Sequence, residues 1–254
     1  MKIGFYDSGL GGLTILRATR EMLPYYDYVY FGDTANLPYG DKSEEEIYTL
    51  AHDAIDKLFQ DGASLIIVAC NTISAEVLRK LQDTVFNNLY PDRRVLGVII
   101  PTIEKLVESD IHNALLIGTR RTVASKKYER ELEKKNFTIQ LSALATPRLV
   151  PLIEAHEFQA AFSALQEIAH GNISNAEAVI LGCTHYTVLK DMIREVYPHV
   201  TVLSQDEIIP EKIMSYLQRH NEIEAKLTRN GTIEIILSEG SERYERIKKL
   251  FFNV

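Results

Sequence analysis

The fold is decided by Leu65-Ile66-Ile67-Val68-Ala69-Cys70-Asn71-Thr72, a stretch with an imperfect second copy in Val179-Ile180-Leu181-Gly182-Cys183-Thr184-His185. Each copy is a short apolar run of the kind that forms a buried strand, and each ends in a cysteine beside small polar residues. Ligands of parallel sheets bind beyond the carboxyl ends of the strands. The chain holds only these two cysteines, so we expect both to lie where chemistry takes place.

Strand-like and helix-like stretches alternate along the rest of the chain, which predicts parallel sheets covered by helices. The order strand, turn, helix and then strand, cysteine, helix occurs once in each half. We therefore predict an α/β fold of two pseudo-symmetric lobes, each a mostly parallel sheet flanked by helices, with the active site between them. Further strands are expected at 3–6, 28–31, 95–99, 114–117, 139–144, 200–203 and 232–237, a proline-punctuated loop at 147–154, and a late helix from about 208.

Composition excludes several classes of protein. Hydrophobic residues make up 46% of the 254 residues and charged residues 25%, as in ordinary globular proteins. The net charge is −7 without a basic run, so no nucleic-acid partner is expected. No apolar stretch approaches the ~20 residues of a membrane span, and residues 1–6 look like a strand and not like a signal peptide. Two distant cysteines form no disulfide framework, which favours the cytoplasm.

Two common kinds of site fit the sequence poorly. Cys183-Thr184-His185 lacks the spacing of metal ligands and Cys70 has no partner nearby, so no metal is expected. Gly9-Leu10-Gly11-Gly12 lacks the third glycine of the dinucleotide fingerprint, because Thr14 stands at that position. The backbone N–H groups of this loop remain a candidate anion cradle. Asp7 beside it would repel phosphate, but it is able to act as a base.

Two opposed thiols without a metal or a disulfide suit the inversion of an amino acid at Cα. One group removes the α-proton and the other supplies a proton from the opposite face, and a thiol of pKa ~8.5 can do either. His185 follows Cys183 by two residues and could lower the pKa of that thiol. No arginine or lysine lies in the stretches proposed for the pocket. Hydroxyl, amide and backbone N–H groups, and no basic side chain, are therefore expected to bind the amino acid.

Four motifs resemble those of the cofactor-independent glutamate racemases, in the same order and across nearly the whole chain. A fifth resemblance covers Gly118-Thr119 with Thr122, Val123, Ser125 and Tyr128. The cysteine motifs alone would place the chain only in the wider aspartate/glutamate racemase superfamily. The four motifs are Asp7-Ser8-Gly9-Leu10-Gly11-Gly12, Gly32-Asp33-Thr34-Ala35-Asn36-Leu37-Pro38-Tyr39-Gly40, Ala69-Cys70-Asn71-Thr72 and Gly182-Cys183-Thr184-His185.

The resemblance implies how the chain is divided and what each part does. Residues 1–98 and 208–254 would form a first lobe carrying Asp7 and Cys70, and residues 99–207 a second lobe carrying Cys183 and His185. The two cysteines would be the catalytic acid/bases, assisted by Asp7, His185 and Glu154. The positions that match substrate-binding residues are Asp7, Ser8, Tyr39, Gly40, Asn71, Thr72, Thr119, Thr122, Thr184 and His185.

The resemblance further implies a cytoplasmic enzyme, often a homodimer, that needs no cofactor and supplies D-glutamate for peptidoglycan. The chain departs from the family pattern at Asn36, at Ile99-Ile100-Pro101-Thr102 and at Ser204-Gln205-Asp206, the last two of which are expected crossovers between the lobes. Two other functions stay open. A sister racemase acting on aspartate or another small amino acid would use the same thiols, whereas a non-catalytic binding protein for small anions would not need them.

Overall fold

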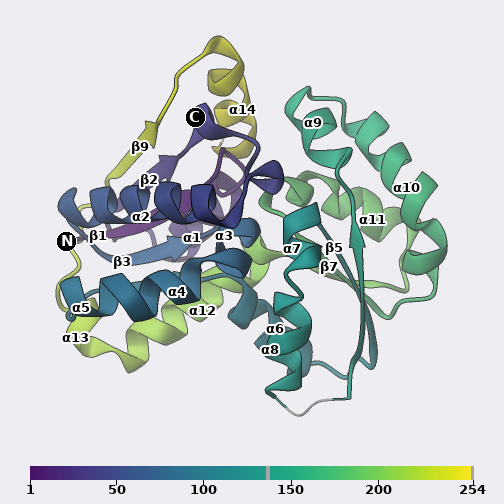
Figure 1. Cartoon of the computed structure of the whole chain (residues 1–254), viewed down its shortest axis with the longest axis horizontal. Coiled ribbons are helices and arrows are strands. Elements are labelled where there is room, and N and C mark those ends of the chain that lie inside the picture. Colours follow the sequence, from purple (N-terminus) through teal and green to yellow (C-terminus); the bar gives the residue numbers. More distant parts are fainter. Residues whose placement is uncertain (136–137, 253–254) are drawn as a thin grey trace.

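The computed structural model describes residues 1–135 and 138–252, whose strands form two parallel sheets (Figure 1). The five-stranded sheet has the order β4-β3-β1-β2-β9, and the four-stranded sheet has the order β6-β5-β7-β8. The predicted α/β fold is therefore confirmed. The strands are β1 (Lys2–Asp7), β2 (Tyr28–Gly32), β3 (Ala63–Val68), β4 (Arg94–Gly97), β5 (Asn113–Gly118), β6 (Gln140–Ala145), β7 (Ala178–Gly182), β8 (Thr201–Leu203) and β9 (Ile233–Leu237).

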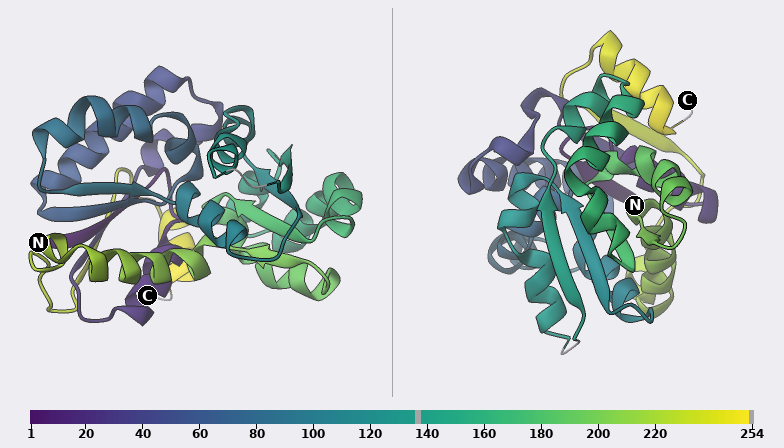
Figure 2. Two further views of the ribbon diagram at one scale, coloured as in Figure 1. Left: turned by 90° about the horizontal axis from the view of Figure 1, so that it is seen from below. Right: turned by 90° about the vertical axis from the view of Figure 1, so that its right-hand side faces the viewer.

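We call the part built on the five-stranded sheet the first lobe and the part built on the four-stranded sheet the second lobe. Figure 2 shows the two sheets well apart, with helices around each. The first lobe carries α1 (Leu13–Met22), α2 (Glu44–Gln60), α3 (Asn71–Glu76), α4 (Leu78–Leu81), α5 (Asn87–Leu89), α12 (Gln205–Arg219), α13 (Asn221–Glu224) and α14 (Glu242–Phe252). The second carries α6 (Ile99–Val107), α7 (Arg120–Ala124), α8 (Lys127–Glu133), α9 (Leu149–Glu154), α10 (Phe158–Ser174) and α11 (Lys190–Val196).

The apolar runs become the central strands of the two sheets. Every residue of β3 and of β7 is buried, as expected for parallel strands covered by helices on both faces. In the first lobe β3 lies beside β1, and in the second lobe β7 lies beside β5. Parallel neighbours end at the same edge of a sheet, so the loop after β1 meets the loop after β3. The loops after β5 and β7 meet in the same way.

The chain returns to the first lobe after β8. Strand β9 pairs in parallel with β2, and α14 packs on α1, so the yellow segment of Figure 1 lies against the purple one. Asp27 stabilises the position of the returning segment because its carboxylate accepts hydrogen bonds from both Asn230 and Thr232, just before β9. The division at residues 98 and 207 itself stays a prediction. No helix in the described part of the chain is long and apolar enough to cross a membrane.

Three predicted boundaries of helices or strands differ from the structure, and each lies near a proline that the structure places inside a helix. The expected strand at 95–99 ends at Gly97, and α6 begins at Ile99 with Pro101 in its first turn. The expected loop at 147–154 is wrong, since Leu149–Glu154 forms α9 with Pro151 in its first turn. The first N–H groups of a helix have no intrahelical partner, so a proline there removes no hydrogen bond. Helix α12 begins at Gln205, three residues earlier than expected, and contains Pro210.

Candidate active site

A pocket of about 800 Å³ lies where the strand ends of the two lobes face each other. Both cysteines line it, although one comes from each lobe and 113 positions separate Cys70 from Cys183 in the chain. Asp7 and Thr122 are fully buried behind the lining. The other residues singled out in the sequence that line the pocket are Ser8, Tyr39, Gly40, Asn71, Thr72, Thr119, Glu154, Thr184 and His185.

Cys70 lies between β3 and α3, as the N-cap of α3, with Ser8 and the Asp7 carboxylate as its polar neighbours. Its Sγ is 3.4 Å from the Oγ of Ser8. Burial and the nearby charge of Asp7 raise the pKa of the Cys70 thiol to about 12. A thiol with this pKa carries its proton at neutral pH. Cys70 is therefore prepared to act as an acid.

Asp7 ends β1, and the chain's own N–H groups hold its carboxylate. Oδ2 accepts hydrogen bonds from the backbone N–H groups of Gly9 and Gly12, at 3.3 and 3.2 Å, and Oδ1 accepts one from Thr184 at 3.5 Å. Burial raises the pKa of Asp7 even so. Two N–H groups of the candidate anion cradle thus already bind an anion that belongs to the chain. A Cβ on Gly12 would lie 2.9 Å from the Cβ of Asp7, so the loop needs glycine there.

Cys183 follows β7 and has a cationic partner. Its Sγ lies 3.9 Å from Nδ1 of His185, and Nε2 of His185 forms an ion pair with Oε1 of Glu154 at 3.2 Å. Burial lowers the pKa of His185, but Cys183 and Glu154 raise it by more, to about 10. His185 is therefore protonated at neutral pH. A positive charge beside a cysteine favours the thiolate, which is the form that removes a proton.

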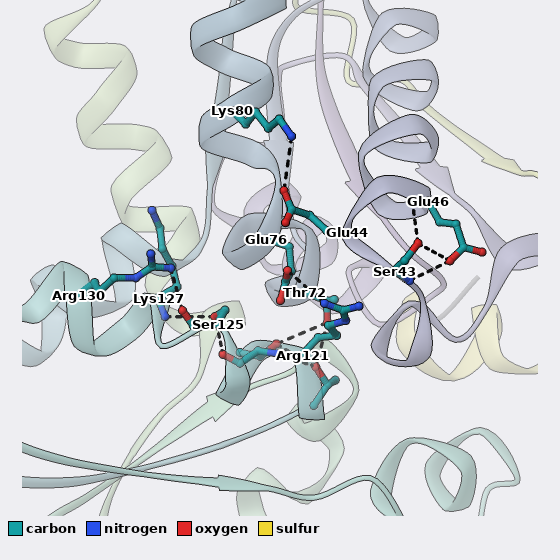
Figure 3. A network of polar contacts seen from close by, with 12 residues as sticks. Ser43, Glu44, Glu46, Thr72, Glu76, Lys80, Arg121, Ser125, Lys127 and Arg130 are labelled. Atoms are coloured by element: carbon teal, nitrogen blue, oxygen red, sulfur yellow. Dashed lines mark hydrogen bonds and ion pairs between the residues drawn. The ribbon is translucent and has the colours of Figure 1, made fainter.

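Hydroxyl groups from both lobes meet beside the pocket. Oγ1 of Thr72 lies 3.0 Å from that of Thr119 and 3.5 Å from that of Thr122, and the last two are 3.0 Å apart. Thr119 also caps α7 by accepting a hydrogen bond from the N–H of Thr122. One turn along α3, Glu76 pairs with Arg121 of α7 at 3.6 Å, as Figure 3 shows. The start of α3 is thus joined to α7 across the two lobes.

The Tyr39 side chain does not offer its hydroxyl to a ligand. The hydroxyl lies 2.9 Å from that of Tyr6 and donates a 2.6 Å hydrogen bond to Asp33. Asn36 and Ser238 also donate to Asp33, so this buried carboxylate holds the whole loop before Gly40. This loop contributes Leu37, Pro38, Tyr39, Gly40 and Asp41 to the lining of the pocket. The role of Asp33 was missed, although it lies in one of the motifs that carry the resemblance.

Two arginines line the pocket, and the expectation that no basic residue does so is wrong. Arg120 lies 3.8 Å from Asp41, Arg148 donates a 2.7 Å hydrogen bond to Glu167, and the side chains are 66% and 60% exposed. Arg120 directly follows Thr119, so its position could have been inferred. Arg148 lies on the segment that was taken for a loop. Tyr244 of α14 lines the pocket too, and no sequence pattern indicates this because its place depends on the return of the chain to the first lobe.

Comparisons with known proteins agree with this geometry. The family model for Asp/Glu/hydantoin racemases matches residues 14–208. A glutamate racemase of Ruegeria sp. (strain TM1040) is 35% identical over 238 residues, which is 88% of this chain and 87% of that protein. The glutamate racemase of Persephonella marina (strain DSM 14350 / EX-H1) is 35% identical over 257 residues, covering 98% of this chain and 93% of the relative.

A solved structure resembles the whole chain as well. The glutamate racemase from Francisella tularensis subsp. tularensis SCHU S4, crystallised with D-glutamate, superposes with a TM-score of 0.88 at 27% identity. The match covers 100% of this chain and 94% of that one. Likeness thus extends from the strand-end motifs through both sheets to the returning segment. The chain belongs to the Asp/Glu/hydantoin racemase family.

Proposed function

We propose that this protein interconverts L-glutamate and D-glutamate, using Cys70 and Cys183 as the two acid/base groups. The observation that carries the proposal is the meeting of both thiols in one pocket, each from the end of a central strand and each with a different ionisable neighbour. The relatives named glutamate racemase, which match along most of the chain, support glutamate as the substrate.

In the direction from L to D, Cys183 acts as the base. Its thiolate, beside protonated His185, takes the α-proton, so the C–H bond breaks as an S–H bond forms. Cys70 then gives its own proton to the opposite face of the α-carbon, and a new C–H bond forms as that S–H bond breaks. The enzyme ends with Cys70 as thiolate and Cys183 as thiol, which is the state that accepts D-glutamate. No proton is gained or lost over the cycle.

The substrate carboxylates are bound by neutral donors at the strand ends and by the arginines at the mouth of the pocket. Hydrogen bonds aimed at the α-carboxylate become more favourable as negative charge spreads onto it in the carbanion. Asp7 lies behind Cys70 and assists it, and Glu154 supports His185. The side-chain donors assigned to the substrate are Ser8, Asn71, Thr72, Thr119, Thr122 and Thr184, together with the peptide groups of Tyr39, Gly40 and His185.

The proposal includes a cellular setting. The enzyme works in the cytoplasm as a homodimer and supplies D-glutamate for peptidoglycan, as the family resemblance implies. Light scattering of the purified protein tests the dimer, because a molar mass near 28.9 kDa would contradict it. Complementation of a strain that requires D-glutamate for growth tests the pathway, with the Cys70→Ala variant as the inactive control.

The activity itself is tested by chiral chromatography. Purified protein is incubated with each enantiomer of glutamate, aspartate and other small amino acids, without an added cofactor. We expect equal amounts of L- and D-glutamate at the end, from either starting enantiomer, and little conversion of the rest. Racemisation of aspartate in preference to glutamate would instead show a sister racemase. No conversion of any amino acid would favour a binding protein.

A further inference from the structure

Gln205 is a buried residue at the second crossover, and neither the motifs nor the proposed chemistry uses it. It begins α12, directly after the segment that leaves β8, and only 3% of its surface is exposed. It does not line the pocket. A buried amide of this kind needs partners, and the partners of Gln205 lead to the site.

The side chains of Gln205 and Asn71 form a reciprocal pair. Nδ2 of Asn71 donates to Oε1 of Gln205 at 2.8 Å, and Nε2 of Gln205 donates to Oδ1 of Asn71 at 2.8 Å. Tyr128 of α8 adds a second donor to Oδ1 of Asn71, at 2.7 Å. Nε2 of Gln205 also reaches the Tyr128 hydroxyl at 3.2 Å. The first lobe, the crossover and the second lobe thus meet at one amide, next to Cys70.

Counting donors and acceptors shows which hydrogen-bonding groups of the Asn71 amide are still unused. An amide oxygen accepts about two hydrogen bonds and an amide nitrogen donates two. Both acceptor sites of Asn71 are used, by Gln205 and Tyr128, whereas only one of its two N–H groups is used. A reciprocal amide pair uses the N–H on the side of the oxygen, so the remaining N–H points away from Gln205. Asn71 lines the pocket and its two partners do not.

The pair also fixes which way the amide faces. Rotating the Asn71 amide by half a turn would set its oxygen against Oε1 of Gln205 and its NH₂ against Nε2. Two hydrogen bonds would be lost in a buried site, where unmet polar groups are costly. Without Gln205, Asn71 could present its oxygen to the pocket, and an oxygen repels a carboxylate. The orientation of Asn71 therefore depends on a residue that a ligand does not touch.

From this geometry we infer that Gln205 is a positioning residue, which holds Asn71 with one N–H aimed at a carboxylate of the bound amino acid. The inference rests on the proposed function, because it takes a substrate carboxylate as the acceptor. It assigns a role to the second crossover. The segment that carries the chain from the second lobe to the first also sets a donor beside Cys70.

The test is a set of kinetic measurements on Gln205→Met, a variant that keeps the length of the side chain and removes both hydrogen bonds. A hydrogen bond to a substrate carboxylate is already made in the bound ground state, so most of its loss raises KM, and only its smaller strengthening in the carbanion lowers kcat. We expect KM for glutamate to rise about tenfold or more, which is the range for one hydrogen bond to a charged group, with kcat within about twofold of wild type.

A double-mutant cycle separates positioning from general damage. If Gln205 acts through Asn71, adding Gln205→Met to Asn71→Ala should change kcat/KM by less than about twofold, since the group to be positioned is already gone. Gln82→Met is the matched control, because Gln82 donates a single 2.6 Å hydrogen bond to the Val95 carbonyl and does not line the pocket. It should leave KM unchanged.

A variant that fails to fold does not end the test. Tyr128→Phe keeps the ring and removes one of the two donors to Asn71, so it should raise KM in the same direction, by about two- to fivefold. Unchanged KM in both Gln205→Met and Tyr128→Phe, or full additivity with Asn71→Ala, would overturn the inference while wild-type racemisation stands. A wild-type protein that does not racemise glutamate would instead overturn the proposed function, and the inference with it.

Discussion

The two sulfur atoms of the pocket face opposite charges. Cys70 lies near the Asp7 carboxylate, which disfavours a thiolate, whereas Cys183 lies near the His185 imidazole, which favours one. The two thiols thus have ionisable neighbours of opposite charge, as suits an inversion between two faces of a carbon. Both cysteines are almost equally buried, at 6% and 8% exposure.

The first prediction concerns Cys70→Ala. With one thiol left, the α-proton can be removed and returned only on one face, so racemisation should fall by about a thousandfold or more. In D₂O, however, Cys183 should still exchange the α-proton of L-glutamate for deuterium without inverting it. Proton NMR of each enantiomer measures the exchange. Cys183→Ala is the matched control, and it should exchange D-glutamate instead. Exchange of the same enantiomer in both variants would refute the assignment of one thiol to each face.

The second prediction concerns alkaline pH. The raised pKa of His185, about 10, means that the imidazolium is present below pH 10 and is lost as the pH rises through that value. Because kcat/KM reports the ionisation of the free enzyme, it should decline above about pH 10 along with the charge that supports Cys183. The substrate ammonium group titrates in the same range, so the wild type is compared with His185→Asn. The part of the decline due to His185 should be missing from the variant, whose kcat/KM at neutral pH should be about ten- to a hundredfold lower. Identical profile shapes would argue against this role of His185.

Sequence reasoning reached the residues whose function follows from local pattern. The cysteines stand at the ends of apolar runs, and Asp7 stands beside a glycine loop, so each could be singled out without a structure. Gln205 and Asp33 could not be assigned a role in this way. Gln205 pairs with Asn71, which is 134 residues away, and Asp33 accepts a hydrogen bond from Ser238, 205 residues away, in addition to those from its near neighbours Asn36 and Tyr39. Spacing along a chain contains no information on such pairs.

At the scale of elements, the loop after β1 packs so closely against the loop after β7 that no side chain fits at Gly11. A Cβ on Gly11 would lie 2.4 Å from Oγ1 of Thr184 and 2.9 Å from the backbone nitrogen of His185. Contacts this short force one of the two loops to move. The glycine of the first lobe therefore permits the close approach that brings Asp7 and Thr184 within 3.5 Å of each other.

The third prediction is that Gly11→Ala damages catalysis more than folding. The methyl group displaces the Thr184–His185 segment, and a shift of about 1 Å in a catalytic group can lower the rate a hundredfold. We expect kcat/KM to fall at least about tenfold, measured with both enantiomers. Gly171→Ala in α10 is the control, because an added Cβ meets nothing within 4 Å there. It should keep full activity and stabilise the fold by about 0.5–1 kcal/mol in thermal unfolding. Normal activity of Gly11→Ala would show that the loops yield without harm.

Elements were predictable where one signal dominated. The capping box of Ser43 and Glu46 correctly placed the start of α2, and Gly62, at φ 93°, correctly placed its end. The starts of α6 and α9 were misjudged because a proline breaks a helix interior but is harmless in a first turn. Telling the two cases apart requires knowing where the preceding strand stops. In the case of β4 it stops two residues earlier than the apolar run suggests.

Over the whole molecule, a net charge of −7 opposes the approach of an anionic substrate, and Arg120 and Arg148 counter that charge at the pocket. Both side chains are exposed and already paired, so each is worth at most about 1 kcal/mol. Interactions of this kind weaken as salt is added. We therefore expect the arginines to serve substrate capture and the buried hydroxyl and amide donors to serve tight binding.

The fourth prediction follows from this division of roles. In the double variant Arg120→Gln/Arg148→Gln, kcat/KM at low salt should fall by about two- to fivefold. Raising the salt concentration to 0.5 M should lower kcat/KM of the wild type by about the same factor and leave the variant nearly unchanged. Arg79→Gln is the control, because Arg79 pairs with Asp83 on an exposed helix outside the pocket. A wild-type rate that does not depend on salt would show that the arginines do not guide the substrate.

The sequence predicted two similar lobes because the strand–cysteine–helix unit occurs twice. It could not predict which strands become neighbours, because the order of strands in the sheet differs from their order in the chain. The first strand, β1, lies at the centre of its sheet, and the last, β9, lies at an edge. The arrangement follows from how buried each strand is. Strand β1 is covered almost throughout, whereas β9 has no fully buried residue: Glu234 is exposed and the other four are partly buried, as suits an edge strand.

The return of β9 to the first sheet has a consequence for the newborn chain. Strand β2 ends at residue 32, and its edge partner β9 begins only at residue 233. The second sheet, in contrast, is made from the single segment 113–203. Translation at roughly 5–20 residues per second therefore lets the second sheet form on the ribosome while the first still has an open edge. Tyr244, which closes part of the pocket, emerges later still. Both thiols leave the ribosome before the site that controls them is finished, and chaperones that cover the open edge next to β2 would protect this enzyme at its most exposed moment.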